Sequence, residues 1–302
     1  MDFSKHIFRS HMVGNIVSIP KPLTERQNET LQAYRERVNG NGKPLTEKQT
    51  KDWHSLENKL NESNTYKLTD TAKNILTNLV FEAKSNRRTK LEVKYFEKGL
   101  EKEKEARDLL SSVMGLMLTA DEERRTNEWV TGKRDIKNDD VIIDIKTAWS
   151  YESFNKHLLS KPNDIYLRQL DCYMELWDIK DGILAHVLVD TPFNLIEDEI
   201  RRLDWKYNIL DFNGEIRDEH IETVKDTVVN HIYTYEALEG FCNQSSNVQL
   251  EWFDDFIELD KSERIHCIAH SFDPVRIKQR NECIKLAREY MNTVKPINTI
   301  IK

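Results

Sequence analysis

The stretch that decides the fold is Val141-Ile-Ile-Asp-Ile-Lys-Thr147. Its first three residues are β-branched and apolar, which is typical of a buried strand. Residues i and i+2 of a strand point to the same face of the sheet, so we expect Asp144 and Lys146 to project side by side. A carboxylate and an amine at the end of a strand can hold a divalent cation and position a water molecule. The stretch therefore predicts hydrolytic chemistry.

The tripeptide Asp-Ile-Lys occurs three times, at Asp135–Lys137, Asp144–Lys146 and Asp178–Lys180. A chain in which 32% of the residues are charged produces such triplets freely, and most of them are solvated charge pairs. The copy at Asp144 differs because it follows an uncharged Val-Ile-Ile run and has Asp135 in front of it, across a turn predicted at Asn138–Asp140. We therefore expect Asp135, Asp144 and Lys146 to form one site, and Asp178–Lys180 to be an ordinary charge pair at a helix end.

The composition indicates a globular chain without a membrane span. A length of 302 residues suits one elaborated domain or two small ones, and a hydrophobic fraction of 38% is adequate for a core. The 7 prolines and 9 glycines argue against long disordered tracts. Apolar runs stay well short of the roughly 18 residues of a membrane helix, and the first residues lack a signal-peptide pattern. These features predict a cytoplasmic location.

Charge and cysteine content narrow the chemistry further. The net charge of −7 means that any contact with nucleic acid has to be local. Cys172, Cys242, Cys267 and Cys283 are widely scattered, so neither disulfides nor a zinc or iron–sulfur site is expected. The histidines that flank Cys267, His266 and His270, alternate as they would on one face of a strand, which makes them a second, weaker candidate for metal binding.

The first 90 residues contain a repeat with a period of 22. The segment Lys21–Gln27 reappears as Lys43–Gln49, and in each copy a threonine and a glutamine have the capping-box spacing of a helix start. The glycines of Asn39–Gly42 favour a helix end between the copies. We expect an antiparallel helical hairpin, followed by a third helix that begins near Thr69 or Asp70. Residues 1–90 are therefore predicted to be an N-terminal segment that precedes a domain over residues 91–302.

The order of elements in residues 91–302 predicts an α/β fold in which helices flank a central mixed sheet. A long helix is expected from about Leu91 to Met114, and Gly99 inside it indicates a close approach by another backbone or a ligand. The strands are expected near 115–119, 127–131, 141–147, 183–190 and 264–270. Further helices are expected over 163–177, from Thr191-Pro192 to about 207, and over 274–293.

Two polar residues on these helices stand out. Glu103 lies one turn after Gly99 on a similar face of its helix. In the helix 163–177, Gln169 shares a face with Tyr173 and the other members of an inward-facing stripe. A buried glutamine must satisfy its amide, either through a hydrogen bond in the core or by facing a bound backbone.

Four motifs in this order resemble the PD-(D/E)XK nuclease superfamily, and in particular its phage lambda-type and YqaJ-type recombination exonucleases. They are Gly99-x-x-x-Glu103, Gly132-Lys-Arg-Asp135, Ile143–Thr147 and Gln169-x-x-x-Tyr173. Together with the strand that ends at Asp190-Thr-Pro192, the resemblance covers roughly residues 92–192. Arg134 stands where the family usually has proline.

The resemblance implies a restriction-endonuclease-like core and a Mg²⁺- or Mn²⁺-dependent deoxyribonuclease. The enzyme would be an exonuclease that degrades duplex DNA from its ends in phage recombination or replication, in the host cytoplasm if the chain is phage-encoded. One or two ions would be held by Glu103, Asp135, Asp144 and the backbone carbonyl of Ile145. Lys146 would orient or deprotonate the attacking water.

The resemblance also assigns residues to the substrate. Gln169 and Tyr173 would position the DNA strand near the metal ions, and Arg9 and Ser10 of Phe8-Arg-Ser10 would hold a terminal phosphate. Partners that it implies are duplex DNA ends, a single-strand annealing protein and further copies of the chain in a homo-oligomer. Polarity, DNA versus RNA preference, processivity, oligomeric state and the role of the N-terminal hairpin stay open.

Several alternatives stay open beside this reading. The same fold could serve a structure-selective or defence-related endonuclease, or a catalytically inert DNA-binding protein. Nucleases of CRISPR adaptation share the Gln-x-x-x-Tyr helix but carry an iron–sulfur cluster, which the cysteine pattern here does not support. A helical interaction module built on the hairpin is the alternative from a different class.

Overall fold

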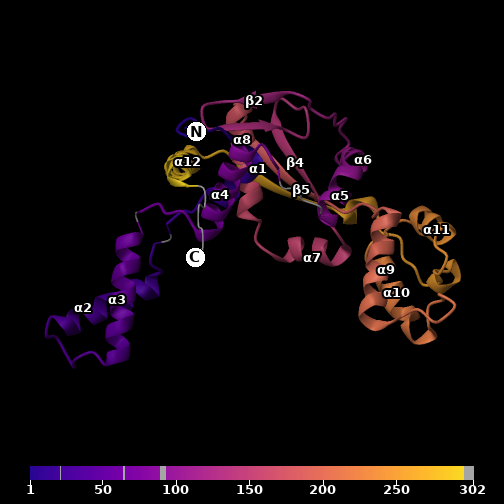
Figure 1. Ribbon diagram of the computed structural model, residues 1–302, viewed down its shortest axis with the longest axis horizontal. Coiled ribbons are helices and arrows are strands. Elements are labelled where there is room, and N and C mark those ends of the chain that lie inside the picture. Colours follow the sequence, from indigo (N-terminus) through magenta and orange to yellow (C-terminus); the bar gives the residue numbers. More distant parts are fainter. Residues whose placement is uncertain (21, 64, 89–92, 296–302) are drawn as a thin grey trace, which may run out of the picture. The chain divides into compact units, whose positions relative to one another are not determined.

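The computed structural model describes residues 1–20, 22–63, 65–88 and 93–295 (Figure 1). By packing, the chain forms two compact units. The first unit contains Met1–Arg88, Asn127–Val130 and the chain from Asp273 onward. The second unit contains Thr89–Thr126 and Thr131–Phe272.

The first unit contains the predicted helical hairpin. Its helices are α2 (Glu25–Val38) and α3 (Glu47–Glu62), which lie side by side in Figure 1. Both capping boxes form as the repeat predicts, because the side chains of Thr24 and Thr46 each accept a hydrogen bond from the backbone of a glutamine three residues later. The hairpin core is small and consists of Leu23, Leu31 and Leu56 with Tyr34, Trp53 and Leu60 around them.

The remainder of the first unit joins both ends of the described chain. The helix α4 (Asp70–Ser85) begins after Thr69, whose side chain caps it as the sequence predicts, and it packs against α12 (Pro274–Thr293). The hydroxyl groups of Thr77 and Tyr290 lie 3.1 Å apart across this contact. The short strand β1 (Phe8–Arg9) leads into α1 (Ser10–Ile16), which packs against both helices.

The second unit is built on a three-stranded mixed sheet with the order β4-β5-β6. The strand β4 (Val141–Thr147) pairs in parallel with β5 (Asp181–Val187), and β5 pairs antiparallel with β6 (Ile265–Ser271). Helices cover both faces, so the predicted α/β fold with a central mixed sheet is confirmed.

The alternation of β4 divides the core between the two faces of the sheet. Ile143 packs with α6 (Glu103–Met114) on one face, and Ile142 packs with α8 (Asp164–Trp177) on the other. Because side chains of a strand alternate, Asp144 and Lys146 continue the face of Ile142 toward α8. The end of β4 thereby brings the polar residues of the strand to the helix that carries Gln169 and Tyr173.

Three predicted elements differ from the structure. The long helix is two helices, α5 (Lys94–Glu101) and α6, because the backbone leaves the helical conformation at Lys102, with φ −102° and ψ 9°. The predicted strand 115–119 is wrong, since Gly115 ends α6 at a positive φ of 65°. The predicted strand 127–131 is shifted to β3 (Val130–Lys133), which pairs antiparallel with β2 (Arg124–Thr126).

The later part of the second unit forms a separate helical layer. It consists of α9 (Phe193–Tyr207), α10 (Ile221–Val229) and α11 (Tyr235–Gln244), which are the orange helices of Figure 1. Its apolar core includes Ile196, Ile200, Val224, Val228, Leu238 and Phe241. Among the helices that the structure describes, none is long and apolar enough to span a membrane.

Candidate active site

Asp144 and Lys146 form a buried ion pair at the end of β4. The ammonium Nζ of Lys146 lies 2.9 Å from Oδ2 of Asp144, whose side chain is completely buried. Apart from this ion pair, both carboxylate oxygens of Asp144 lack a hydrogen-bond partner among the described residues. Burial disfavours the charge on Lys146, but the neighbouring carboxylates of Asp144 and Asp135 outweigh it and hold the pKa of Lys146 above its usual value. Lys146 is therefore a cation that faces two acidic groups.

Asp135 reaches the same place from the turn before β4. Its Oδ2 accepts a hydrogen bond of 2.9 Å from the backbone N–H of Ile145. Burial, reinforced by the nearby charge of Asp144, raises the pKa of Asp135 to about 7. Two carboxyl groups in one poorly solvated place cannot both be ionised cheaply unless a positive charge joins them.

Gln169 links Lys146 to the helix α8. The Lys146 ammonium donates to Oε1 of Gln169 at 3.1 Å, and Nε2 of Gln169 donates to the hydroxyl of Tyr173 at 2.9 Å. Both α8 residues are buried, with exposed fractions of 7% and 5%. The sequence left open whether the Gln169 amide forms a core hydrogen bond or faces a bound backbone. In the structure both of its hydrogen bonds lie in the core, and one of them goes to Lys146.

Glu103 lies in the same cavity but is turned toward solvent. The cavity has a volume of about 490 Å³ and is lined by Glu103, Asp135 and Lys146, with Phe96, Gly99 and Tyr166 among its other walls. The Glu103 carboxylate forms a loose ion pair of 4.0 Å with Arg107 and is about half exposed. A side chain at Gly99 would meet nothing within 4 Å among the described residues, so the predicted close approach of another protein backbone is wrong.

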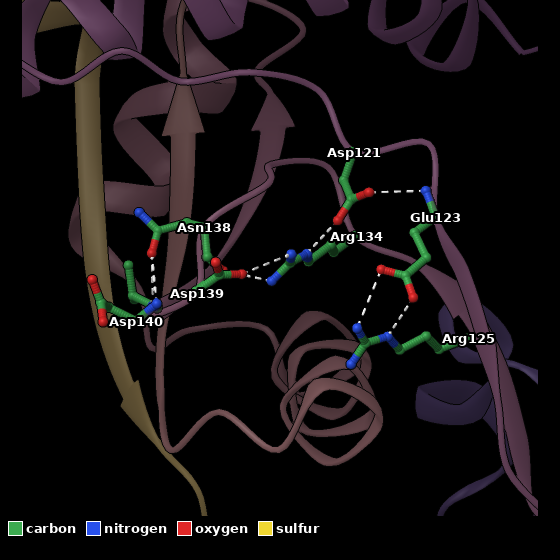
Figure 2. A network of polar contacts seen from close by, with 8 residues as sticks. Asp121, Glu123, Arg125, Arg134, Asn138, Asp139 and Asp140 are labelled. Atoms are coloured by element: carbon green, nitrogen blue, oxygen red, sulfur yellow. Dashed lines mark hydrogen bonds and ion pairs between the residues drawn. The ribbon is translucent and has the colours of Figure 1, made fainter.

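Arg134, which precedes Asp135 in the sequence, pairs with Asp121 and with Asp139 of the turn before β4 (Figure 2). Its guanidinium is buried, pairs with the carboxylate of Asp121 at 2.5 Å and donates to the backbone carbonyl of Asn138. The backbone N–H of Asp121 donates in turn to the carbonyl of Asp135 at 3.3 Å. The guanidinium also lies 5.1 Å from the ring centre of Trp177. These contacts fix both ends of the turn between Asp135 and β4.

Two residues of this region were not predicted to belong to the site. The ring of Tyr166, three residues before Gln169 on the same helix face, lies 5.1 Å from the Lys146 ammonium. The helical period could have indicated it, because residues i and i+3 are neighbours. Lys98 is fully buried and donates to the carbonyl of Trp149 at 3.0 Å, and burial lowers its pKa to about 7. A lysine in a charged helix carries no sequence signal of burial.

The remaining predicted residues belong to other elements of the chain. His270 pairs with Asp171 at 2.8 Å, whereas the ring of His266 is parallel to that of His186, so the two histidines of β6 have different surroundings. Arg9 is exposed and Ser10 is buried, and both belong to the first unit. Their predicted contact with a terminal phosphate stays a prediction. Asp178 and Lys180 form the expected exposed pair at the end of α8, at 2.6 Å.

The donor set at the end of β4 fits a hard divalent cation. Asp144 offers two buried oxygens without hydrogen bonds, and Asp135 offers a carboxylate beside them. Within the described residues, no three His, Cys, Asp or Glu side chains are grouped to hold a metal by themselves. Mg²⁺ usually binds through one or two carboxylates and completes its shell with water and substrate phosphates, so two carboxylates are an adequate start.

Comparison with known proteins supports the fold. No protein-family model matches the chain, and no curated protein matches it. A phage-related exonuclease from Haemophilus somnus 129PT has a similar structure, with a TM-score of 0.54 and 21% identity over 95% of this chain and 93% of its own. The alkaline exonuclease LHK-Exo from Laribacter hongkongensis aligns with a TM-score of 0.45, 11% identity and 74% coverage of this chain. The chain therefore shares its fold with the phage-related exonuclease.

Proposed function

We propose that this protein is a metal-dependent exonuclease that hydrolyses phosphodiester bonds at the ends of duplex DNA, with an active site of the PD-(D/E)XK type. The observation that carries the proposal is the arrangement at the end of β4, where Asp135, Asp144 and Lys146 converge. The fold shared with a phage-related exonuclease supports it. A role in phage recombination or replication belongs to the same proposal.

The two carboxylates would hold the metal ion. Their charges are concentrated in a poorly solvated place, which favours binding of a cation over two bare anions. Asp135 and Asp144 would be ligands, with Glu103 and the carbonyl of Ile145 as the further ligands that the family resemblance implies. A bound Mg²⁺ or Mn²⁺ supplies charge neutralisation at the phosphoryl oxygens and a lowered pKa for water.

Lys146 would act on the attacking water and on the developing negative charge. Its ammonium is held by Asp144 on one side and by Gln169 on the other, so its position is set before the substrate arrives. Preorganised charge of this kind stabilises a transition state without further reorganisation. Gln169 and Tyr173 would keep the lysine in place and lie beside the bound strand.

The decisive experiment compares DNA topologies. The full chain is incubated with Mg²⁺ or Mn²⁺ and linear duplex DNA, closed circular DNA or single strands. We expect degradation of linear duplex, no cleavage of circles, and loss of activity in Asp144→Ala and Lys146→Ala. Asp178→Ala and Lys180→Ala change the identical but exposed triplet and serve as matched controls that keep full activity.

Each other outcome has a definite meaning. Cutting of closed circles would replace the exonuclease by an endonuclease on the same fold. Binding of linear DNA without cleavage, with either metal, would indicate an inert DNA-binding protein. If Asp144→Ala and Lys146→Ala both keep nuclease activity, the site at the end of β4 does not catalyse the reaction. The annealing-protein partner and the homo-oligomer stay predictions of the family resemblance.

A further inference from the structure

A second cavity adjoins the proposed active site. It has a volume of about 460 Å³ and lies where β4 passes into α7 (Tyr151–Leu159). It shares Tyr95, Lys146, Thr147 and Tyr166 with the cavity that contains Asp135. Its size falls within the range of cavities that bind small organic ligands, which is about 300–1,000 Å³. A substrate positioned at Lys146 would therefore have this space beside it.

His186 is one of the residues that line this cavity. It is the register partner of Lys146 on the neighbouring strand, so both side chains stand on the same face of the sheet. The ring is 2% exposed, yet its Nδ1 has no hydrogen-bond partner among the described residues. Buried polar atoms are normally satisfied, and an unsatisfied one in a cavity wall indicates a missing ligand or water.

Besides His186, the lining residues include four aromatic side chains, those of Tyr95, Trp149, His157 and Tyr166, among charged and small polar ones. The ring of His157 stacks on His186 at 4.0 Å with an angle of 13° between the planes. Tyr95 and Trp149 meet edge to face at 5.2 Å. Such a set of rings around one polar atom suits a flat heterocycle, which can stack on a ring and place a polar edge against a side chain.

The cavity is poorly suited to a phosphate. Burial, with the neighbouring His157, lowers the pKa of His186 to about 3, so its ring is neutral at neutral pH. At the start of α7 the N–H of Ser153 donates to the Ser150 side chain and that of Tyr151 donates to a backbone carbonyl. The Lys156 ammonium is paired with Glu152 at 2.6 Å. The positive charge and the free N–H groups that an anion needs are therefore largely taken.

We propose that this cavity binds the nucleobase of a nucleotide that adjoins the scissile phosphate, by stacking on its aromatic walls and by a hydrogen bond to Nδ1 of His186. The inference rests on the proposed nuclease function, because the cavity is placed by its shared wall with Lys146. It assigns to the enzyme a contact with the base, although the chemistry concerns only the backbone. His186 would be a substrate-binding residue that the sequence does not indicate.

The test pairs an enzyme variant with an altered substrate. Duplexes carry a tetrahydrofuran abasic residue at the terminal or the second nucleotide of the degraded strand. For the wild type we expect kcat/KM to fall about tenfold on one of these two abasic duplexes, as loss of one stacked base does. His186→Phe should lower kcat/KM about fivefold on intact DNA, the effect of one hydrogen bond. When the base is removed, kcat/KM of this variant should fall much less than that of the wild type. His266→Phe, in the same row of the sheet but outside the cavity, should behave as wild type.

A direct binding measurement separates this inference from the nuclease function. Saturation-transfer NMR on the full chain without metal uses deoxyadenosine and deoxyribose 5-phosphate as probes. We expect base protons of deoxyadenosine to report contact with the wild type, more weakly with His186→Phe and with Tyr95→Ala, whose exposed position guards against misfolding. If the protein binds deoxyadenosine but has no nuclease activity, the proposed function is wrong and the base site is retained. An equal abasic penalty in wild type and His186→Phe, or binding of deoxyribose 5-phosphate alone, would overturn the base site.

Discussion

Lys146 and Asp144 form an ion pair of 2.9 Å in which the carboxylate is completely buried and the ammonium is mostly buried. Gln169 on α8 is a second partner of Lys146, because its Oε1 accepts a hydrogen bond of 3.1 Å from the ammonium. A charge held by two fixed partners loses little freedom when it acts on a substrate. The pair is therefore the part of the molecule on which function should depend most.

Replacing Lys146 by Gln should lower the nuclease rate by about two to four orders of magnitude, which is the usual range for a positioned general base or acid. It should also destabilise the fold by about 3–5 kcal/mol, because it leaves a buried carboxylate without its counter-ion. The measurements are initial rates on linear duplex DNA and urea unfolding. Lys180→Gln, in an exposed pair of the same sequence, should change neither quantity. A folded Lys146→Gln protein with full activity would contradict the assignment.

Gln169 should couple energetically to Tyr173 because its amide donates to the tyrosine hydroxyl at 2.9 Å. We expect Tyr173→Phe to cost about 1 kcal/mol of unfolding free energy. Gln169→Leu should cost about 1–3 kcal/mol, since it also leaves the hydroxyl of Tyr173 unpaired in the core. The double variant should cost less than the sum by at least about 0.5 kcal/mol. Strict additivity in urea unfolding would show that the two side chains act independently.

The local part of the site was predictable from the sequence. Asp144 and Lys146 share a face because a strand has a period of two, and Gln169 and Tyr173 share a face because a helix brings i and i+4 together. The capping boxes of the hairpin follow in the same way from residues three apart. In each case a short-range rule of backbone geometry is sufficient.

The non-local part was not predictable. Lys146 and His186 are neighbours because of the register between two parallel strands. The two residues are separated by 39 others in the sequence, and no local rule predicts this register. The break at Lys102 comes three residues after Gly99 and involves no proline, so helix propensity alone does not fix its position. The strand β2 consists of Arg-Arg-Thr and lacks an apolar pattern, and it forms because β3 pairs with it.

Asp135 should make stability depend on pH in the direction opposite to most carboxylates. Its pKa is raised to about 7, above the ordinary value of 3.8, so the folded state favours the protonated form. The stabilisation is fully present below about pH 4 and is lost as the pH rises through about 7. Without divalent ions, Asp135→Asn should therefore melt above the wild type at pH 8 and close to it at pH 4.

The metal can be tested on the same pair of proteins. Mg²⁺ should raise the melting temperature of the wild type at pH 8, because binding to the folded state alone stabilises it. The increase should be much smaller for Asp135→Asn, and Asp178→Asn should respond like the wild type. If neither Mg²⁺ nor Mn²⁺ at millimolar concentration changes the melting temperature of the wild type, there is no metal site between Asp135 and Asp144.

Arg134 should support the active site through Asp121 rather than by touching the substrate. The two side chains form a pair of 2.5 Å and are only 3% and 6% exposed. Removing one partner of such a pair costs about 3–5 kcal/mol, because the other charge stays buried. We expect that loss for Arg134→Met and for Asp121→Leu, and a smaller loss than the sum for the double variant.

A nearby pair provides the control for this network. Glu123 and Arg125 are drawn in the same view (Figure 2), with a distance of 2.7 Å, but both are about half exposed. Glu123→Gln should therefore leave the midpoint of urea unfolding unchanged. Because Asp121 also holds the backbone of Asp135, a conservative Arg134→Lys that still folds should weaken the Mg²⁺ response at pH 8. An unchanged Mg²⁺ response in that variant would limit Arg134 to stability and leave the placement of Asp135 to its own hydrogen bond with Ile145.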